Sequence, residues 1–288
     1  MSSLLLLERL SDEDLAMLAE VSGEATGSGA AASRLRADPA RVGDLIERPE
    51  VFRALFRSRR REDLVFVSPF LAFSVLLAQA ARELAEASFV AERTAAGRWV
   101  PVFDVATLRD FVAGQMRRLF LAELLSSYTH VASGTVWAKS GGRWRRRRFS
   151  ELDPVQLARL AELVPDWERL AVYRRLGDLA LFLTGVFPDY AGRWLDGRRV
   201  EPIRRALKLN WRGEGAAPDR DDDAMQLLER VGRRAYELAA AGSDSPRTVG
   251  MVGVVAELSD HFSQARRVLN FLTDRHPFPM RDRWFPLA

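Results

Sequence analysis

The chain has 288 residues, a formal net charge of +4 and no cysteine, and 48% of its residues are hydrophobic. This length allows one large domain or two small ones, and the apolar content excludes a fibrous fold or global disorder. The absence of cysteine excludes disulfides, a thiolate nucleophile, iron–sulfur clusters and cysteine-ligated zinc. A cysteine-free chain fits a reducing compartment, and we expect a soluble, cytoplasmic protein.

The N-terminal region predicts short helices separated by one flexible stretch. Ser11 caps a helix that runs to about Glu20. The stretch 22–33 is rich in glycine, alanine and serine, which is typical of a flexible loop. Asp38-Pro39 then opens a helical region that Pro49 divides into two short helices.

Leu64–Ala81 is an apolar segment of 18 residues without a charge. It is short for a membrane span, Pro69 and Gln79 interrupt it, and a charged amphipathic helix continues from it to about Thr94. Ser68 and Pro69 match a helix cap and a first turn. We therefore predict a central helix that is buried on all sides, rather than a membrane span.

Two extended runs follow a helix predicted over Val105–Tyr128. They flank Ser140-Gly141-Gly142, which is typical of a hairpin loop, so we predict a β-hairpin over 134–149. Asp153-Pro154 caps the next helix. Further helical periodicity predicts helices over about 167–186, 222–241 and 248–274.

No strand–helix alternation and no internal repeat is present, so a doubly wound sheet or a barrel is excluded. We predict an all-α fold, a multi-helix bundle of about eight helices with one short basic β-hairpin insertion. Composition does not shift along the chain, which indicates a single helical domain over 1–288.

The familiar chemical motifs are missing. The sequence has no GxxxxGK[ST], GxGxxG, GxSxG or HExxH motif, so we expect no nucleotide or dinucleotide cofactor and no metal. Histidine occurs at three positions, His130, His261 and His276. Glu257 and His261 are four residues apart on one helix face, a spacing that a surface hydrogen bond explains without a ligand.

The strongest compositional outlier is Lys139–Ser150, KSGGRWRRRRFS. The segment contains six cations and no acid, so the rest of the chain sums to −2. In an extended strand the cations occur on both faces, so the strand projects into solvent or contacts an anionic partner. The residues concerned are Lys139, Arg143, Arg145, Arg146, Arg147 and Arg148, with Trp137 and Trp144 beside them.

Three interpretations of this basic hairpin remain open. Arginine with interleaved aromatics suits phosphate contacts and base stacking. It also suits an acidic protein or an anionic membrane face. Alternatively, the charges only protect a solvated edge from aggregation.

Asp178 lies within an apolar helical series, between Gly177 and Gly185. A buried carboxylate needs a partner, and Arg174 is four residues earlier on the same helix. We interpret Asp178 as a structural buried acid paired with Arg174. The alternative is a perturbed catalytic acid in the bundle interior, together with Glu257 and His261.

Two strings, RRLGDLALFLTGVFP and FLAELLSSYTHVASG, resemble segments of an uncharacterised helical protein family of GC-rich bacteria. The resemblance implies a bacterial cytoplasmic protein and transfers no activity and no site residue. We predict a binding or scaffold protein that contacts a protein or another anionic partner through the hairpin; a homo-oligomer is a further option for its partner. The alternatives are a nucleic-acid-associated factor that uses the hairpin, and an enzyme or small-ligand binder with an interior site.

Overall fold

The computed structural model describes residues 2–23, 28–57, 67–93, 99–130, 133–140, 143–188, 200–209, 221–241, 251–276 and 285. Its backbone contacts divide into two compact units, each assembled from separate chain segments. Unit 1 comprises Met1–Val90, Phe103–His130 and Phe271–Ala288, and unit 2 comprises Ala91–Val102 and Val131–Asn270. This division concerns compactness, so a single domain over 1–288 stays a prediction.

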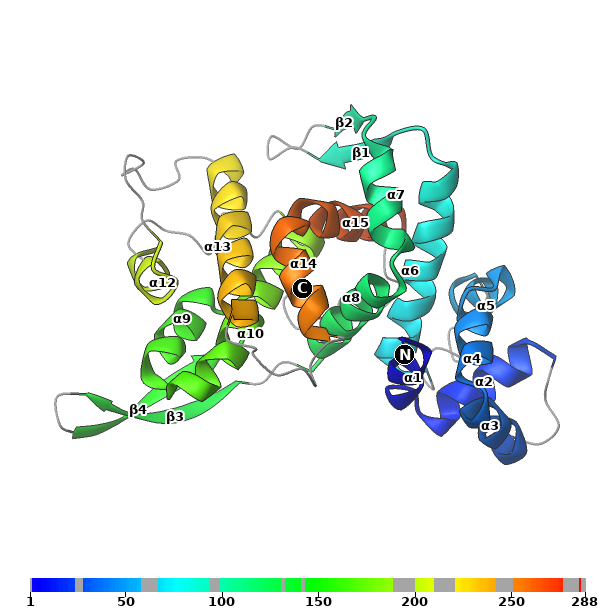
Figure 1. The fold of residues 1–288 in the computed structure, drawn as a ribbon, viewed down its shortest axis with the longest axis horizontal. Coiled ribbons are helices and arrows are strands. Elements are labelled where there is room, and N and C mark those ends of the chain that lie inside the picture. Colours follow the sequence, from blue (N-terminus) through cyan, green and yellow to red (C-terminus); the bar gives the residue numbers. More distant parts are fainter. Residues whose placement is uncertain are drawn as a thin grey trace. The chain divides into compact units, whose positions relative to one another are not determined.

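The described residues form fourteen helices and two two-stranded sheets, β1–β2 and the antiparallel pair β3–β4 (Figure 1). The all-α class is thus supported, while the helices outnumber the eight expected and β1–β2 is an additional strand pair. The helices are α1 (Ser2–Glu8), α2 (Asp12–Val21), α3 (Ser28–Ala37), α4 (Pro39–Ile46), α5 (Pro49–Phe56), α6 (Pro69–Glu86), α7 (Val105–Ala113), α8 (Gln115–Ser127), α9 (Pro154–Leu163), α10 (Asp166–Val186), α12 (Val200–Ala206), α13 (Asp221–Ala241), α14 (Met251–Asp260) and α15 (Phe262–Arg275). The strands are β1 (Val90–Arg93), β2 (Trp99–Val102), β3 (Ser133–Ser140) and β4 (Arg143–Ser150).

Helix α6 forms the centre of unit 1. Its cap is the one expected, because the Ser68 hydroxyl accepts from the Leu71 backbone N–H and Pro69 occupies the first turn. Phe73 is fully buried and stacks on Phe285, with ring centroids 5.8 Å apart. Of the segment predicted over Leu64–Ala81, the buried helix is confirmed for Pro69–Ala81; Val67 and Ser68 precede the helix, and residues 64–66 lie outside the described part. Among the residues that the structure describes, no helix is long and apolar enough to span a membrane.

Four of the predicted boundaries are wrong. Ser28–Ser33 is the start of α3 rather than part of a flexible loop, because a run of alanines favours a helix; residues 24–27 lie outside the described part. Gly114 separates α7 from α8, and His261 separates α14 from α15. Helix α6 ends at Glu86, well before Thr94.

The early end of α6 has a tertiary cause. The Arg109 guanidinium, on α7, donates from Nε to the Leu84 carbonyl at 2.7 Å and from Nη2 to the Ala87 carbonyl. Carbonyls at a helix end lack the usual intrahelical donors, and the Leu84 carbonyl accepts one backbone bond besides, from the Ala87 N–H at 3.4 Å. Arg109, a residue of another helix, therefore donates hydrogen bonds to the backbone carbonyls at the end of α6. The chain then continues into β1, which begins at Val90.

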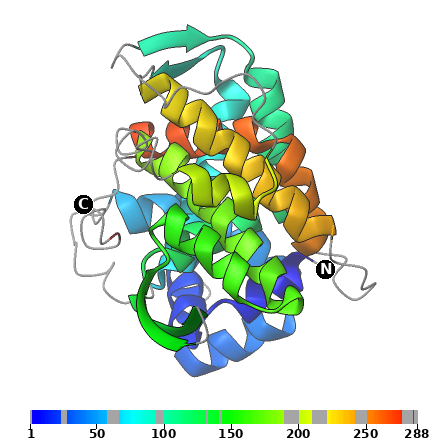
Figure 2. The same cartoon turned by 90° about the vertical axis from the view of Figure 1, so that its left-hand side faces the viewer.

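In unit 2, α10 packs along α13, and both views show the two helices together (Figures 1 and 2). Glycines permit the close approach. A Cβ atom at Gly177 would lie 2.6 Å from the Tyr236 ring, and one at Gly185 would lie 2.8 Å from Leu269. These distances are too short for any other residue, so Gly177 admits α13 and Gly185 admits α15 close to α10.

Candidate functional site

The most distinctive feature of unit 2 is the strand pair β3–β4, which we call the basic ribbon. Its strands pair antiparallel over the predicted range, with Ser133 opposite Ser150 and Ser140 opposite Arg143. The predicted hairpin strands are thus confirmed, while the glycines of the expected loop, residues 141 and 142, lie outside the described part. Figure 1 shows the ribbon extending beyond α9.

The register determines which residues share a face of the ribbon. Trp137 pairs with Arg146, and Lys139 pairs with Trp144. Because alternate residues of a strand lie on the same face, both tryptophans share a face with Lys139, Arg146 and Arg148. The other face contains Arg143, Arg145 and Arg147. Cationic positions therefore occur on both faces, and only one face has the tryptophans.

The ribbon contains no acid that could neutralise these charges. Opposite the five arginines of β4 the register places serine, alanine, tryptophan, valine and threonine. The next acid along the chain, Glu151, forms a 2.8 Å ion pair with Arg175 of α10, and both side chains are mostly buried. Glu151 is therefore engaged by α10.

The base of the ribbon is firmly anchored to α9. The Ser150 carbonyl accepts from the Asp153 backbone N–H at 3.2 Å, and Leu152 is buried. Asp153 then caps α9, since its Oδ1 accepts from the backbone N–H groups of Val155 and Gln156. The ribbon thus begins at a packed and capped helix start.

Elsewhere in unit 2, arginines are used for internal ion pairs. The Glu92 carboxylate of β1 bridges two arginines of α15, with Oε1 2.8 Å from Arg266 Nη2 and Oε2 3.0 Å from Arg267 Nη2. All three side chains are largely buried, at 20%, 12% and 29% exposure. This bridge holds β1 on α15.

Glu229 of α13 extends this network. It accepts hydrogen bonds from Ser263 and from Arg233, the latter at 2.9 Å, and lies 3.3 Å from Arg266. Burial alone would raise the pKa of Glu229, but the two hydrogen bonds and the nearby guanidinium charges lower it overall. These arginines serve the packing of unit 2.

Asp178 is buried at 6% exposure beside the glycine contact of α10 with α13. Its Oδ1 accepts a 2.9 Å hydrogen bond from the Tyr236 hydroxyl, and its Oδ2 lies 3.9 Å from Arg174 Nε. Sequence reasoning missed Tyr236, which lies on another helix. The one local signal was Gly177, which marks a close neighbour.

The three residues of the alternative interior site do not share an environment. Glu257 is exposed, and His261 is half-buried with Nδ1 2.9 Å from the Glu257 carbonyl oxygen. Glu257 therefore does not line the interior with Asp178. In the described residues, no group of three or more His, Asp or Glu side chains could hold a metal ion.

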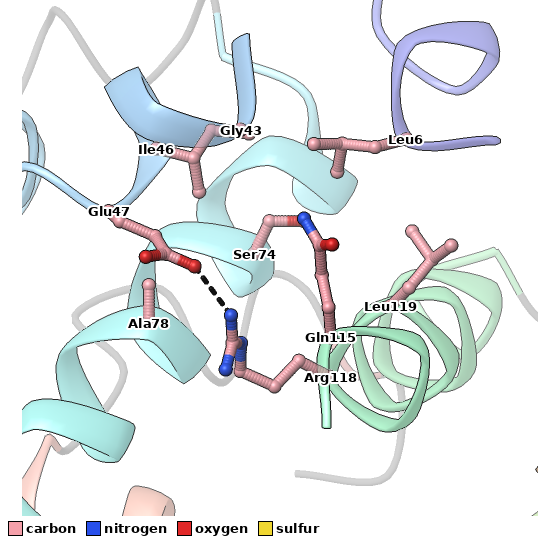
Figure 3. Close-up of a pocket in the computed structure, with 9 residues that line it drawn as sticks. All are labelled: Leu6, Gly43, Ile46, Glu47, Ser74, Ala78, Gln115, Arg118 and Leu119. Carbon is pink, nitrogen blue, oxygen red and sulfur yellow. Dashed lines mark hydrogen bonds and ion pairs between the residues drawn. The ribbon is translucent and has the colours of Figure 1, made fainter. Parts of the chain in front are cut away.

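Unit 1 contains a small pocket between α1, α4, α6 and α8 (Figure 3). Glu47 and Arg118 form an ion pair within its lining, which also includes Leu6, Ser74 and Gln115. Its volume of about 30 Å³ has room for a few water molecules. Pockets for metabolites are roughly ten times larger or more, so this pocket does not suit a substrate.

Comparisons with protein-family models, with curated proteins and with solved structures gave no match for this chain. The resemblance to a helical family of GC-rich bacteria stays a prediction. The inference of function therefore rests on the residues themselves.

Proposed function

We propose that this protein acts by binding, and that the basic ribbon docks an anionic macromolecule. The observation that supports the proposal is the charge of the ribbon: six cations, none opposite an acid in the strand register, and a flanking Glu151 that Arg175 already engages. We extend the proposal to a soluble protein in the cytoplasm, where the absence of cysteine fits the reducing conditions.

The physical argument concerns repulsion between neighbouring guanidinium groups. Five arginines within six residues repel one another, so the isolated ribbon gains nothing from its own charges. An anionic surface relieves this repulsion, and its bound counterions are released when the arginines replace them. Binding of this kind weakens steeply as the salt concentration rises.

An enzyme is the less supported alternative. It requires a concave site with converging polar groups. The pocket of unit 1 has room for a few water molecules, and Glu257 is exposed rather than gathered with Asp178. Neither feature supports an interior active site.

The test compares the salt concentration at which variants elute from a heparin column. Heparin serves as the polyanionic probe. The ribbon variant replaces Arg145, Arg146, Arg147 and Arg148 by serine. The matched control replaces four exposed helix arginines by serine, with the same change in net charge; these are Arg53, Arg204, Arg205 and Arg230.

We expect the ribbon variant to elute at much lower salt than the wild type, and the control to elute close to the wild type. Circular dichroism checks that both variants retain their helices. Equal shifts in the two variants would mean that only net charge matters, and would refute a docking role for the ribbon.

A further inference from the structure

We infer that the partner of the basic ribbon is a single-stranded nucleic acid; this inference rests on the proposed function and specifies its ligand. From the sequence we favoured a protein partner over a nucleic acid, because the chain outside the hairpin is slightly acidic. The register of β3 and β4 changes that ranking. This register could not be derived from the sequence alone, because a shift of one residue in the pairing moves every side chain of a strand to the opposite face.

The first step of the argument is the composition of one face. Trp137, Trp144, Lys139, Arg146 and Arg148 occupy alternate positions that share this face. Trp137 pairs with Arg146, and Trp144 is two residues before Arg146. The tryptophans are therefore diagonal neighbours, roughly 7–8 Å apart along the ribbon.

The second step concerns what such a face recognises. Proteins bind single strands by stacking bases on aromatic residues and by tracking the phosphates with cations. Sheet faces with two or three aromatics bind unpaired RNA in this way. Two tryptophans among three cations on one β-face provide both elements. On an acidic protein surface the cations would pair with carboxylates, and each tryptophan would have to fill an apolar pocket of the partner instead of stacking on a base.

The third step concerns the opposite face, where Arg143, Arg145 and Arg147 occupy alternate positions. A folded acidic protein that docks on the ribbon would bring its carboxylates to one face of the ribbon only. A single strand is flexible and carries a phosphate at every nucleotide, so it can pass around the edge of the ribbon and meet cations on both faces. The distribution of charge over two faces thus fits a flexible polyanion better than a flat patch.

The experiment separates stacking from charge with two probes of equal length. One is a fluorescent oligonucleotide of thymines, and the other is the same backbone without bases. Affinities of the full-length protein are measured by fluorescence anisotropy at two salt concentrations. Further arms use single-stranded RNA, duplex DNA and polyglutamate.

We expect the wild type to prefer the base-containing strand. Trp144→Ala should weaken binding to that strand by about 5- to 150-fold, the effect of losing one base–aromatic stack, and leave binding to the abasic strand unchanged. Trp137→Ala should behave alike. The matched control is Trp167→Ala, which removes a tryptophan of α10 that is 75% exposed and lies outside the ribbon.

Each result decides between the two levels of the proposal. Equal affinity of the wild type for both strands, or tighter binding to duplex DNA or polyglutamate, would overturn the single-strand inference and leave a polyanion-docking ribbon standing. If the protein binds none of the probes, or if its binding does not depend on Arg145–Arg148, both the single-strand inference and the docking role of the ribbon are overturned. The RNA arm identifies which single strand is preferred.

Discussion

The buried pair of Asp178 and Tyr236 allows a quantitative test of how α10 and α13 are held together. Tyr236→Phe removes only the hydroxyl that donates to the carboxylate at 2.9 Å. Tyr236 is fully buried and Asp178 is 6% exposed, so water cannot easily replace the lost donor. Asp178→Ala removes the acceptor and leaves the tyrosine hydroxyl buried.

The magnitude follows from these exposures. A hydrogen bond to a charged group contributes about 1.5–3 kcal/mol, so Tyr236→Phe should lower the free energy of unfolding by that amount. Arg174 adds less than the sequence suggested. Its side chain is 36% exposed and 3.9 Å from the carboxylate, so solvent weakens the ion pair to about 1 kcal/mol or below. The hydroxyl of Tyr236 is thus the more important partner.

The assay is a double-mutant cycle from urea denaturation followed by circular dichroism. We expect a coupling energy of about 1–3 kcal/mol between the two positions. Asp178→Asn is the control, because its carbonyl oxygen can still accept from Tyr236 and most of the stability should remain. A coupling energy below about 0.5 kcal/mol would refute the reasoning, since it would mean that the two groups act independently.

Three other predictions follow from contacts within each unit. Phe73→Ala should lower the free energy of unfolding by about 3–5 kcal/mol in urea titrations, because the ring is fully buried against Phe285. Burial holds the pKa of His276 below its ordinary value, against the pull of the Glu83 carboxylate. The unfolded chain then binds more protons, so stability should fall as the pH drops below about 6.5, and fall less in His276→Gln; equal pH profiles would contradict this. Glu92→Gln should destabilise unit 2 by about 1–3 kcal/mol, and added phosphate should restore part of the lost melting temperature by pairing with the two arginines of α15. A melting temperature unaffected by phosphate would show that those arginines need no counter-charge.

The sequence predicted best where a boundary depends on neighbouring residues. Ser68-Pro69 and Asp153-Pro154 are local caps, and both helices begin there. The sequence prediction failed where a helix boundary depends on a residue from another helix. The end of α6 depends on Arg109, which is 25 residues from Leu84 and satisfies its carbonyl from another helix.

The same distinction applies to the candidate site. The charge of the ribbon and its strands follow from composition and alternation, so the segment itself was predictable. The face shared by Trp137 and Trp144 depends on the pairing register, which the loop geometry sets. Tyr236 lies 58 residues from Asp178, and no local pattern links the two.

The assembly of unit 1 from three chain segments has a consequence for protein synthesis. Phe285 completes the packing over Phe73, yet the whole of 131–270 is translated between them. At about 5–20 residues per second, the nascent chain exposes this apolar surface of α6 for on the order of ten seconds or longer. An emerging polypeptide in that state is a natural client for ribosome-associated chaperones, and the closing ring arrives only after unit 2 has left the exit tunnel.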